Sequence, residues 1–339
     1  MKNRILACIL VIVMLAACVG CSSQEQEDTS GEATGDAGET IRLGVSTQTF
    51  SISVYVMMEE AASALGKEKG VEVEWLSCDY DPTKQTSQVE NFISQGYDAV
   101  CVEPVMPETG DTLIEMCEEA GIPVFTLETM AATKIPEVHI VADSVRVGEM
   151  QAEYFIEQWG TEEPANVVVL SATKGDHIAE LITEGVLSVL EQHDNINIVM
   201  HQWCQNWDPA VAMSHMENAI SANQGDIQAV FANNDQMANG ALKAAINEGC
   251  AEDLWVIGAD FDEETVVNIR DGYNMATLDK GAYLQGERIV EVALQLANGE
   301  EPTSDGMDGD TKCWFTPITM VDADNLEEMV ETKFPDLAQ

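Results

Sequence analysis

The sequence predicts an α/β fold in which parallel sheets are covered by helices on both faces, arranged as two domains. From Ile41 onward, short β-type runs alternate with helical patterns, and successive runs begin mostly about 25 to 30 residues apart. That spacing is one strand–helix–strand step, the unit of parallel sheets. The chain has 339 residues. About ten strands are too many for one compact open sheet, so two domains of roughly 130 to 150 residues each are expected.

The segments with strand character are Ile41–Ser46, Val71–Leu76, Ala99–Val102, Val124–Leu127, Val138–Ala142, Val167–Ser171, Ile196–Gln202, Ala229–Ala232, Trp255–Gly258 and Met275–Leu278. The helices between them carry their own start and stop signals. After the second segment, Asp81 can cap a helix, Pro82 suits its first turn and Gly96 follows its end. Gly121 closes the next helix in the same way.

The N-terminus has the three parts of a secretory signal in order. Lys2 and Arg4 form a positive region, residues 5–17 are almost unbroken apolar, and small residues precede Cys18. The apolar run is too short for a comfortable membrane span. Leu-Ala-Ala-Cys resembles a bacterial lipobox, which implies a signal peptide of residues 1–17 and acylation of Cys18, with Cys21 as a second candidate. Residues 18–40 are small, polar and acidic, and we predict that they form a flexible tether.

The charge balance excludes several kinds of partner. The chain has 60 Asp and Glu against 15 Lys and Arg, a formal net charge of −45. Nucleic-acid affinity depends mainly on cationic side chains that neutralise phosphates, so DNA and RNA are not expected partners. An anionic bilayer would also repel this surface, so membrane association is expected only through the N-terminal lipid.

The cysteines, histidines and glycines give no catalytic or metal motif. Among the nine cysteines, those of the body are dispersed and lie mostly in apolar surroundings, where a buried hydrophobe is the default, although export permits a disulfide. No G-x-G-x-x-G, Walker loop, G-x-S-x-G or H-E-x-x-H motif is present, and the five histidines are scattered. We therefore predict no cofactor and no metal site.

Hydrogen-bonding side chains follow many of the predicted strands. In open α/β sheets, ligands bind outside the carboxyl ends of the strands. Those ends are Ser46-Thr47-Gln48, Glu103-Pro104, Glu128-Thr129, Asp143-Ser144, Asn233-Asn234-Asp235, Asp260 and Asp279-Lys280. Together they predict one polar cleft, although each residue alone could be a turn or cap residue, and Asp235 is expected to cap the helix before Met237. Trp207 lies in a polar loop and could stack on a ligand or cover the core.

Four stretches, each in the family's order and spacing, resemble the ribose-binding-type extracellular solute-binding proteins of bacterial sugar ABC transporters. They are "DPTKQTSQVENFISQGYDAVCVEPV", "AGIPVFTLET", "AVFANNDQMANGALKA" and "IGADFDEETVVNIRDG", and the similarity covers roughly residues 41–331. The resemblance implies a type I periplasmic binding fold of two Rossmann-like lobes with parallel sheets, joined by three crossovers. It implies an N-terminal lobe of residues 41–142 plus 281–305 and a C-terminal lobe of 143–280 plus 306–339.

The resemblance also implies positions for the ligand and the hinge. Ligand contacts are expected from Ser46, Gln48, Phe50, Glu103, Glu128, Trp207, Asn234, Asp260 and Lys280. Bending is expected near Asp143, near Asp279 and Gly281, and in a third crossover around residues 303–309. Phe50 is the expected substitute for an aromatic run that family members often have after the first strand. Where ribose binders place an Asp-Arg pair this chain has Glu128-Thr129, and a second arginine is matched by Ile182, so ribose is not the expected ligand.

We therefore predict a monomeric, non-enzymatic protein that is exported and lipid-anchored outside the cell membrane or in the periplasm. It captures a sugar or sugar-like molecule and delivers it to an ABC transporter permease. A neutral or amino sugar is expected to bind better than a nucleoside, and a sugar acid or phosphate worst, because the cleft is rich in carboxylates. Two alternatives remain open at this stage: a ligand sensor for a membrane receptor, and an exported glycosidase that uses Glu103 and Glu128.

Overall fold

The computed structural model describes residues 40–334 and 337. The predicted signal peptide, both candidate lipid-attachment cysteines and nearly all of the predicted tether lie outside these residues. Among the described residues, no helix is long and apolar enough to cross a membrane.

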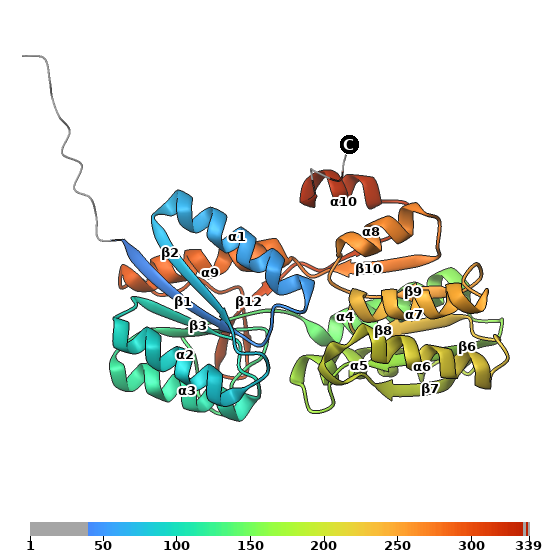
Figure 1. The fold of residues 1–339 in the computed structure, drawn as a ribbon, viewed down its shortest axis with the longest axis horizontal. Coiled ribbons are helices and arrows are strands. Elements are labelled where there is room, and N and C mark those ends of the chain that lie inside the picture. Colours follow the sequence, from blue (N-terminus) through green and yellow to red (C-terminus); the bar gives the residue numbers. More distant parts are fainter. Residues whose placement is uncertain (1–39, 335–336, 338–339) are drawn as a thin grey trace, which may run out of the picture. The chain divides into compact units, whose positions relative to one another are not determined.

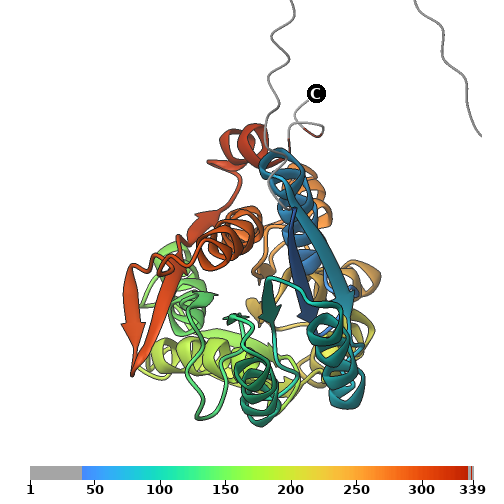
Figure 2. The ribbon, with the colours of Figure 1, turned by 90° about the vertical axis from the view of Figure 1, so that its left-hand side faces the viewer.

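The first sheet has seven strands: β1 (Ile41–Thr47), β2 (Val71–Ser77), β3 (Ala99–Val102), β4 (Val124–Leu127), β5 (His139–Ala142), β11 (Gly306–Asp308) and β12 (Thr311–Thr316). Their order across the sheet is β11-β12-β5-β4-β3-β1-β2, and all neighbours are parallel except β11 and β12. Figure 2 shows β11 and β12 at one edge of this sheet and the blue β2 at the other. We call this sheet and its helices the first lobe.

Helices cover both faces of the first sheet, which explains the continuous apolar runs of its central strands. These helices are α1 (Ser53–Lys69), α2 (Pro82–Gln95), α3 (Pro107–Ala120) and α9 (Ala282–Ala297). Alternate residues of β3 enter separate cores: Val100 and Val102 pack with α2 and α3, whereas Cys101 joins the core that contains α1 and α9. As predicted, Asp81 caps α2 by accepting from the backbone N–H groups of Thr83 and Lys84.

The second sheet has six strands: β6 (Ala165–Ser171), β7 (Ile196–Trp203), β8 (Ala229–Ala232), β9 (Trp255–Ile257), β10 (Met275–Asp279) and β13 (Thr319–Val321). Its order is β13-β10-β9-β8-β6-β7, with only β13 antiparallel to its neighbour. Its helical elements are α4 (Ser144–Trp159), α5 (His177–Leu190), the 3-10 turn η1 (Gln205–Trp207), α6 (Pro209–Ala222), α7 (Asp235–Glu248), α8 (Glu263–Arg270) and α10 (Leu326–Lys333). We call this sheet and its helices the second lobe, and Figure 1 shows the two lobes side by side.

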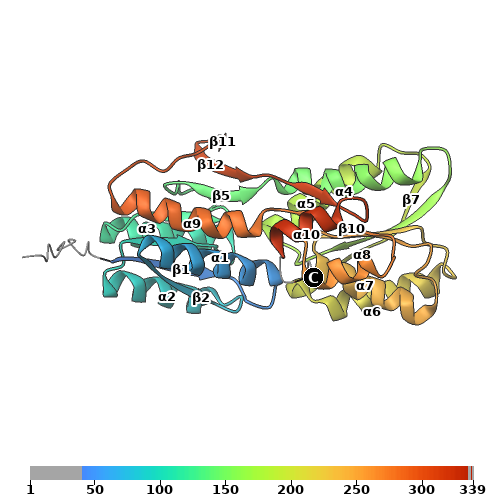
Figure 3. The ribbon, with the colours of Figure 1, turned by 90° about the horizontal axis from the view of Figure 1, so that it is seen from above.

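The chain passes between the two sheets three times. It crosses from β5 to α4 at Asp143, from β10 to α9 at residues 280–281, and from β12 to β13 at residues 317–318. In Figure 3, β5 and β12 run side by side toward the second lobe. The first two crossovers lie where the sequence analysis expected them. Gly281 has a φ of 73°, a left-handed conformation that favours glycine at the second crossover.

The predicted third crossover, around residues 303–309, is wrong. Residues 306–316 form β11 and β12, and β12 pairs in parallel with β5 of the first sheet. The expected lobe boundary after residue 305 is therefore about eleven residues too early, since residues 306–316 lie in the first lobe. The reason is that these strands are short, three residues in β11 and six in β12, and β12 is held in the first sheet by pairing with β5, which is distant in the sequence.

Candidate functional site

A small cavity lies between the two lobes, at the carboxyl ends of several parallel strands. It has about 330 Å³ of space not occupied by protein atoms, part of it open to solvent. Its lining comes from the first lobe (Ile52, Val54, Tyr55, Glu103, Glu128), the second lobe (Asp176, Ile178, Trp207, Asp260) and the second crossover (Lys280).

Glu103, directly after β3, is a carboxylate whose two oxygens are both occupied by the protein. Tyr55 donates its hydroxyl hydrogen to Oε1, and the backbone N–H of Gln48 donates to Oε2 at 3.1 Å. Burial raises the pKa of Glu103 well above its usual value, against the effect of these two donors. Burial and the adjacent Glu103 also raise the pKa of Tyr55, so its phenol remains a donor.

Glu128, directly after β4, is buried to a similar degree but is not satisfied. Its side chain is 4% exposed and its Oε1 atom has no hydrogen-bond partner. Its backbone N–H donates to the carbonyl of Ile140 at 2.8 Å, which fixes its position beside β5. Its φ is 53°, a left-handed conformation uncommon for a residue with a side chain. A buried carboxylate oxygen with no partner is an unused hydrogen-bond acceptor, and the Glu128 side chain belongs to the cavity lining.

Asp260 and Lys280 form a buried ion pair between the second lobe and the crossover. The Nζ atom of Lys280 lies 2.9 Å from Oδ1 of Asp260. Burial alone would lower the pKa of Lys280, but the carboxylates of Asp260 and Glu128 outweigh it and raise the pKa, so the lysine stays protonated. Burial raises the pKa of Asp260 to about 6 despite the lysine. The pair thus brings one ammonium group, with donors left over, to the cavity wall.

Trp207 and Asp176 form the second-lobe wall. Trp207 is 7% exposed, and its indole Nε1 donates to Oδ2 of Asp176 at 3.2 Å. The other oxygen of Asp176 accepts from the backbone N–H of Ala179 at 3.1 Å and so caps α5. Asp176 therefore orients the indole, whose position beside Ile178 adds an apolar wall to the cavity.

Strained backbone is concentrated in the loops around this cavity. Non-glycine residues with positive φ are Asp79, Tyr80, Glu128, Asn206, Trp207, Gln224, Asp260 and Phe261. All except Gln224 lie in loops that follow strands β2, β4, β7 and β9 at the facing edges of the two sheets. Such conformations cost of order 1–3 kcal/mol each and collect at ligand-binding sites.

Several residues that were expected to contact the ligand either form their hydrogen bonds inside the first lobe or do not line the cavity. The hydroxyl of Ser46 donates to Gln88 at 2.7 Å inside the first lobe, and the Gln48 amide donates to the carbonyl of Pro104 at 3.0 Å. Phe50 is 39% exposed and does not line the cavity. Ile182 is wholly buried, so the position matched to the second arginine faces the core of the second lobe.

The cap of α7 is Asn234, not Asp235 as expected. Oδ1 of Asn234 accepts from the backbone N–H of Met237 at 3.0 Å, while its buried Nδ2 has no partner. Asp235 lies one residue further along, and its Oδ2 accepts from the backbone N–H of Asp262 at 3.0 Å. Asn234 is therefore held in place by the helix terminus and keeps one free donor.

The remaining lining residues were missed by sequence reasoning. Ile52, Val54 and Tyr55 open the first helix, and Asp176 and Ile178 open α5, each several residues beyond a strand end. The helix-cap pattern of Asp176 before α5 was the available signal, but the same pattern precedes α2, α4 and α8, and it indicates a helix start rather than a ligand.

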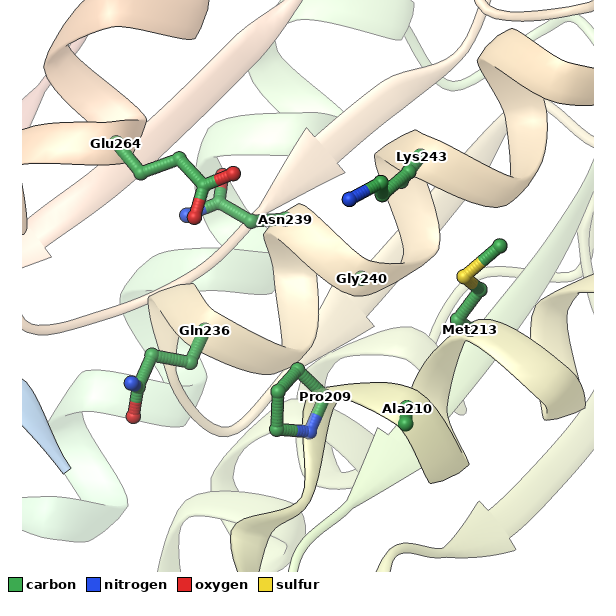
Figure 4. A pocket seen from close by; sticks show the side chains of 8 residues that line it. All are labelled: Pro209, Ala210, Met213, Gln236, Asn239, Gly240, Lys243 and Glu264. Atoms are coloured by element: carbon green, nitrogen blue, oxygen red, sulfur yellow. The ribbon is translucent and has the colours of Figure 1, made fainter. Parts of the chain in front are cut away.

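The lobes touch where the side chain of Gln236 donates to the carbonyl of Ser51 at 3.1 Å. A separate hollow lies wholly on the second lobe, between α6, α7 and α8, and Figure 4 shows the side chains of Gln236, Asn239, Lys243 and Glu264 around it. None of its lining residues comes from the first lobe or from a crossover, so the residues that follow the strands in the inter-lobe cavity are absent from its lining.

Within residues 40–334 and 337, no cluster of His, Cys, Asp and Glu could hold a metal ion. The six cysteines in that part of the chain are free thiols, and all but Cys250 are buried. They therefore act as small hydrophobic residues of the cores.

The comparison with protein families decides what this arrangement is. A family model described as a periplasmic binding protein domain matches residues 43–301. The chain belongs to the periplasmic binding protein family. The two-lobed fold with mostly parallel sheets is also that of an ABC transporter solute-binding protein from Bacillus halodurans with bound myo-inositol. The TM-score is 0.78 at 28% identity, and the match covers 89% of this chain and 100% of the other. The predicted fold class is thereby confirmed.

Curated members of the periplasmic binding protein family are similar over most of the chain. The ribose import binding protein of Bacillus subtilis is 28% identical over 86% of this chain and 93% of its own length. The D-xylose-binding periplasmic protein of Escherichia coli is 29% identical over 77% of this chain and 80% of its own length. These family members are named as binding proteins.

Proposed function

We propose that this protein is an extracytoplasmic solute-binding protein that captures one sugar or polyol of monosaccharide size and delivers it to an ABC transporter permease. The observation that carries the proposal is the cavity itself, which takes its walls from both lobes and from a crossover. Two relatives are named for ribose and xylose, and a third was crystallised with bound myo-inositol; all three compounds are small polyhydroxylated molecules. These relatives are binding proteins, which agrees with the expectation that the chain is not an enzyme.

The chemistry of the cavity supports a ligand with many O–H groups. Carboxylates such as Glu128 accept hydrogen bonds, and Lys280 can donate one to a hydroxyl oxygen. The apolar side chains of Ile52, Val54, Ile178 and Trp207 offer a surface for the C–H groups of a ring. A sugar acid or phosphate is disfavoured because its charge would meet several carboxylates and a lysine that is already paired.

Capture is proposed to involve closure of the lobes about the crossovers. The crossovers at residues 142–144, 280–281 and 317–318 are short, and only the first and second were expected at their positions. The contact of Gln236 with Ser51 would open with the lobes. Small-angle scattering should show a smaller radius of gyration when ligand is bound, and an unchanged radius with confirmed binding would refute closure.

The N-terminal segment supports a lipid anchor at Cys18. Cleavage before this cysteine and its acylation would hold the folded body at the outer face of the membrane through an acidic tether, with the protein acting as a monomer. Replacing Cys18 by Ser should release the protein from membranes in fractionation. Retention in the membrane with an uncleaved N-terminus would contradict the anchor.

The direct test of function is a thermal-shift screen of neutral sugars, polyols, nucleosides and sugar acids. A ligand that binds only the native state raises the melting temperature by mass action. We expect the largest shift from a neutral or amino monosaccharide or a cyclic polyol, and recovery of that compound unchanged. Turnover of a glycoside would instead support the exported glycosidase. The other alternative is a sensor that delivers its ligand to a membrane receptor. In that case, cells that lack the protein should still take up the ligand at the normal rate.

A further inference from the structure

The charged groups that face the cavity do not balance. Four carboxylates line it, from Glu103, Glu128, Asp176 and Asp260, whereas the cationic lining residue is Lys280. Tyr55 is the remaining titratable group of the lining, and it is neutral because its pKa is raised by burial. A largely buried site with this excess of acceptors favours a ligand that supplies donors.

Three of the four carboxylates already have partners within the protein. In two of them both oxygens accept hydrogen bonds, and the third is in contact with a lysine. Glu103 accepts from Tyr55 and from the backbone of Gln48. Asp176 accepts from the backbone of Ala179 and from the indole of Trp207. Asp260 is paired with Lys280 at 2.9 Å.

Glu128 is the exception among these four. Its carboxylate is buried, its Oε1 has no hydrogen-bond partner, and no lysine, arginine or histidine of the described residues forms an ion pair with it. The nearest positive charge that acts on it is Lys280, which is in contact with Asp260. Resting on the proposed function, we propose that the ligand is a sugar or polyol that carries an ammonium group, and that the carboxylate of Glu128 binds this group.

An ammonium group satisfies Glu128 more completely than a hydroxyl group does. A hydroxyl hydrogen fills the free lone pair but leaves a buried negative charge without a counter-ion. An ammonium group forms the same hydrogen bond and neutralises the charge, and hydrogen bonds of this kind are the stronger ones. Ile178 and Trp207 add apolar surface to the lining from the second lobe, whereas Glu128 comes from the first, so the cavity offers separate places for an amine and for a C–H face of the ligand.

Matched pairs of compounds test this proposal. Each pair differs by one amine in place of one hydroxyl: D-glucosamine with D-glucose, D-galactosamine with D-galactose, and an inosamine with myo-inositol. Calorimetry with the full mature chain measures the affinity of both members of each pair at pH 6.5, where the amines are protonated. We expect the amine of one pair to bind at least about tenfold more tightly than its neutral partner.

Two variants with the same chemical change locate the amine. In Glu128→Gln, the preference for the amine should fall at least about tenfold, because the amide keeps an acceptor but has no charge. In Glu103→Gln, the same substitution is made at a glutamate of the same cavity whose two oxygens already accept from Tyr55 and from the backbone of Gln48. Both members of the pair should then lose affinity to a similar extent, so the preference is kept.

The outcomes separate the two proposals. A neutral member that binds as tightly as its amine partner, or a preference unchanged in Glu128→Gln, overturns the ammonium proposal and leaves the sugar-binding function intact. A preference that falls equally in both variants also overturns the role of Glu128. If no member of any pair binds to protein that unfolds cooperatively, the proposed function and the ammonium proposal are both refuted.

Discussion

The carboxyl ends of β3 and β4 each place one glutamate in the same cavity, with nearly the same burial, yet the two ends are built differently. Glu103 is enclosed by Tyr55 and the backbone of Gln48, whereas Glu128 keeps an oxygen without a partner on a strained backbone. Burial and charge alone would give both glutamates the same role. The count of hydrogen-bond partners separates a carboxylate that holds the first lobe together from one that is open to a ligand.

The largest effect should come from the cation beside these carboxylates. Lys280→Met leaves Asp260 buried without a counter-ion, and loss of one member of a buried pair costs about 3–5 kcal/mol of unfolding free energy. Urea unfolding of the ligand-free protein measures it. The double variant Lys280→Met with Asp260→Asn should recover most of the loss, and a loss below about 1 kcal/mol in the single variant would show that the pair is not buried as described.

The pH dependence of stability tests whether these carboxylates are as buried as they are in the structure. The pKa of Asp260 is about 6 in the folded protein, above its usual value, so the folded state holds this proton more tightly than the unfolded state. Its contribution is fully present below about pH 4 and is lost as the pH rises through about 6. The ligand-free melting temperature should therefore rise on going from pH 8 to pH 5, and Asp260→Asn should flatten the rise. A fall over that range would contradict the assignment.

The two glutamates themselves should respond differently to replacement by glutamine. Glu103→Gln disrupts acceptors for Tyr55 and Gln48 and should cost about 1–3 kcal/mol of unfolding free energy. Glu128→Gln removes an unpaired buried charge and should change it by less than about 0.5 kcal/mol or increase it. Equal destabilisation of both variants in urea would remove the distinction between the two strand ends.

The smallest expected effect concerns the back of the hinge. Lys333 of α10 lies 3.3 Å from Asp279, which also accepts from the backbone N–H of Gly281 at the second crossover. Lys333→Ala should lower the melting temperature by only a few degrees, since a partly exposed pair contributes up to about 1 kcal/mol. Ligand affinity should change little, and a loss of affinity as large as that of a cavity variant would place α10 in the binding mechanism.

The sequence was sufficient for the ten strands β1 to β10 and for the cavity residues that directly follow some of them. Glu103, Glu128, Asp260 and Lys280 each follow a parallel strand, and the rule for open sheets brings such residues to one edge. The rule does not say which hydrogen-bond partners each side chain finds. Ser46 and Gln48 obey it equally well, but their partners, Gln88 and Pro104, are distant in sequence and lie inside the first lobe.

The remaining features depend on contacts that local patterns do not record. β12 is a strand because it pairs with β5, far away in the chain, and this pairing moved the third crossover to residues 317–318. Asp176 and Ile178 reach the cavity from the first turn of a helix on the other lobe. Phe50 is expected to contact the ligand only because it is aromatic. The residues of this segment that line the cavity are instead Ile52, Val54 and Tyr55.

The central claim is that the inter-lobe cavity is the ligand site and that Glu128 faces the ligand. The most direct measurement is a crystal structure of the protein with the sugar, polyol or amino sugar that raises its melting temperature most. We predict electron density for one monosaccharide-sized molecule between Glu128, Lys280 and Trp207, with a donor of the ligand within hydrogen-bond distance of the Glu128 carboxylate. Density in the hollow between α6, α7 and α8, with the inter-lobe cavity empty, would contradict the account.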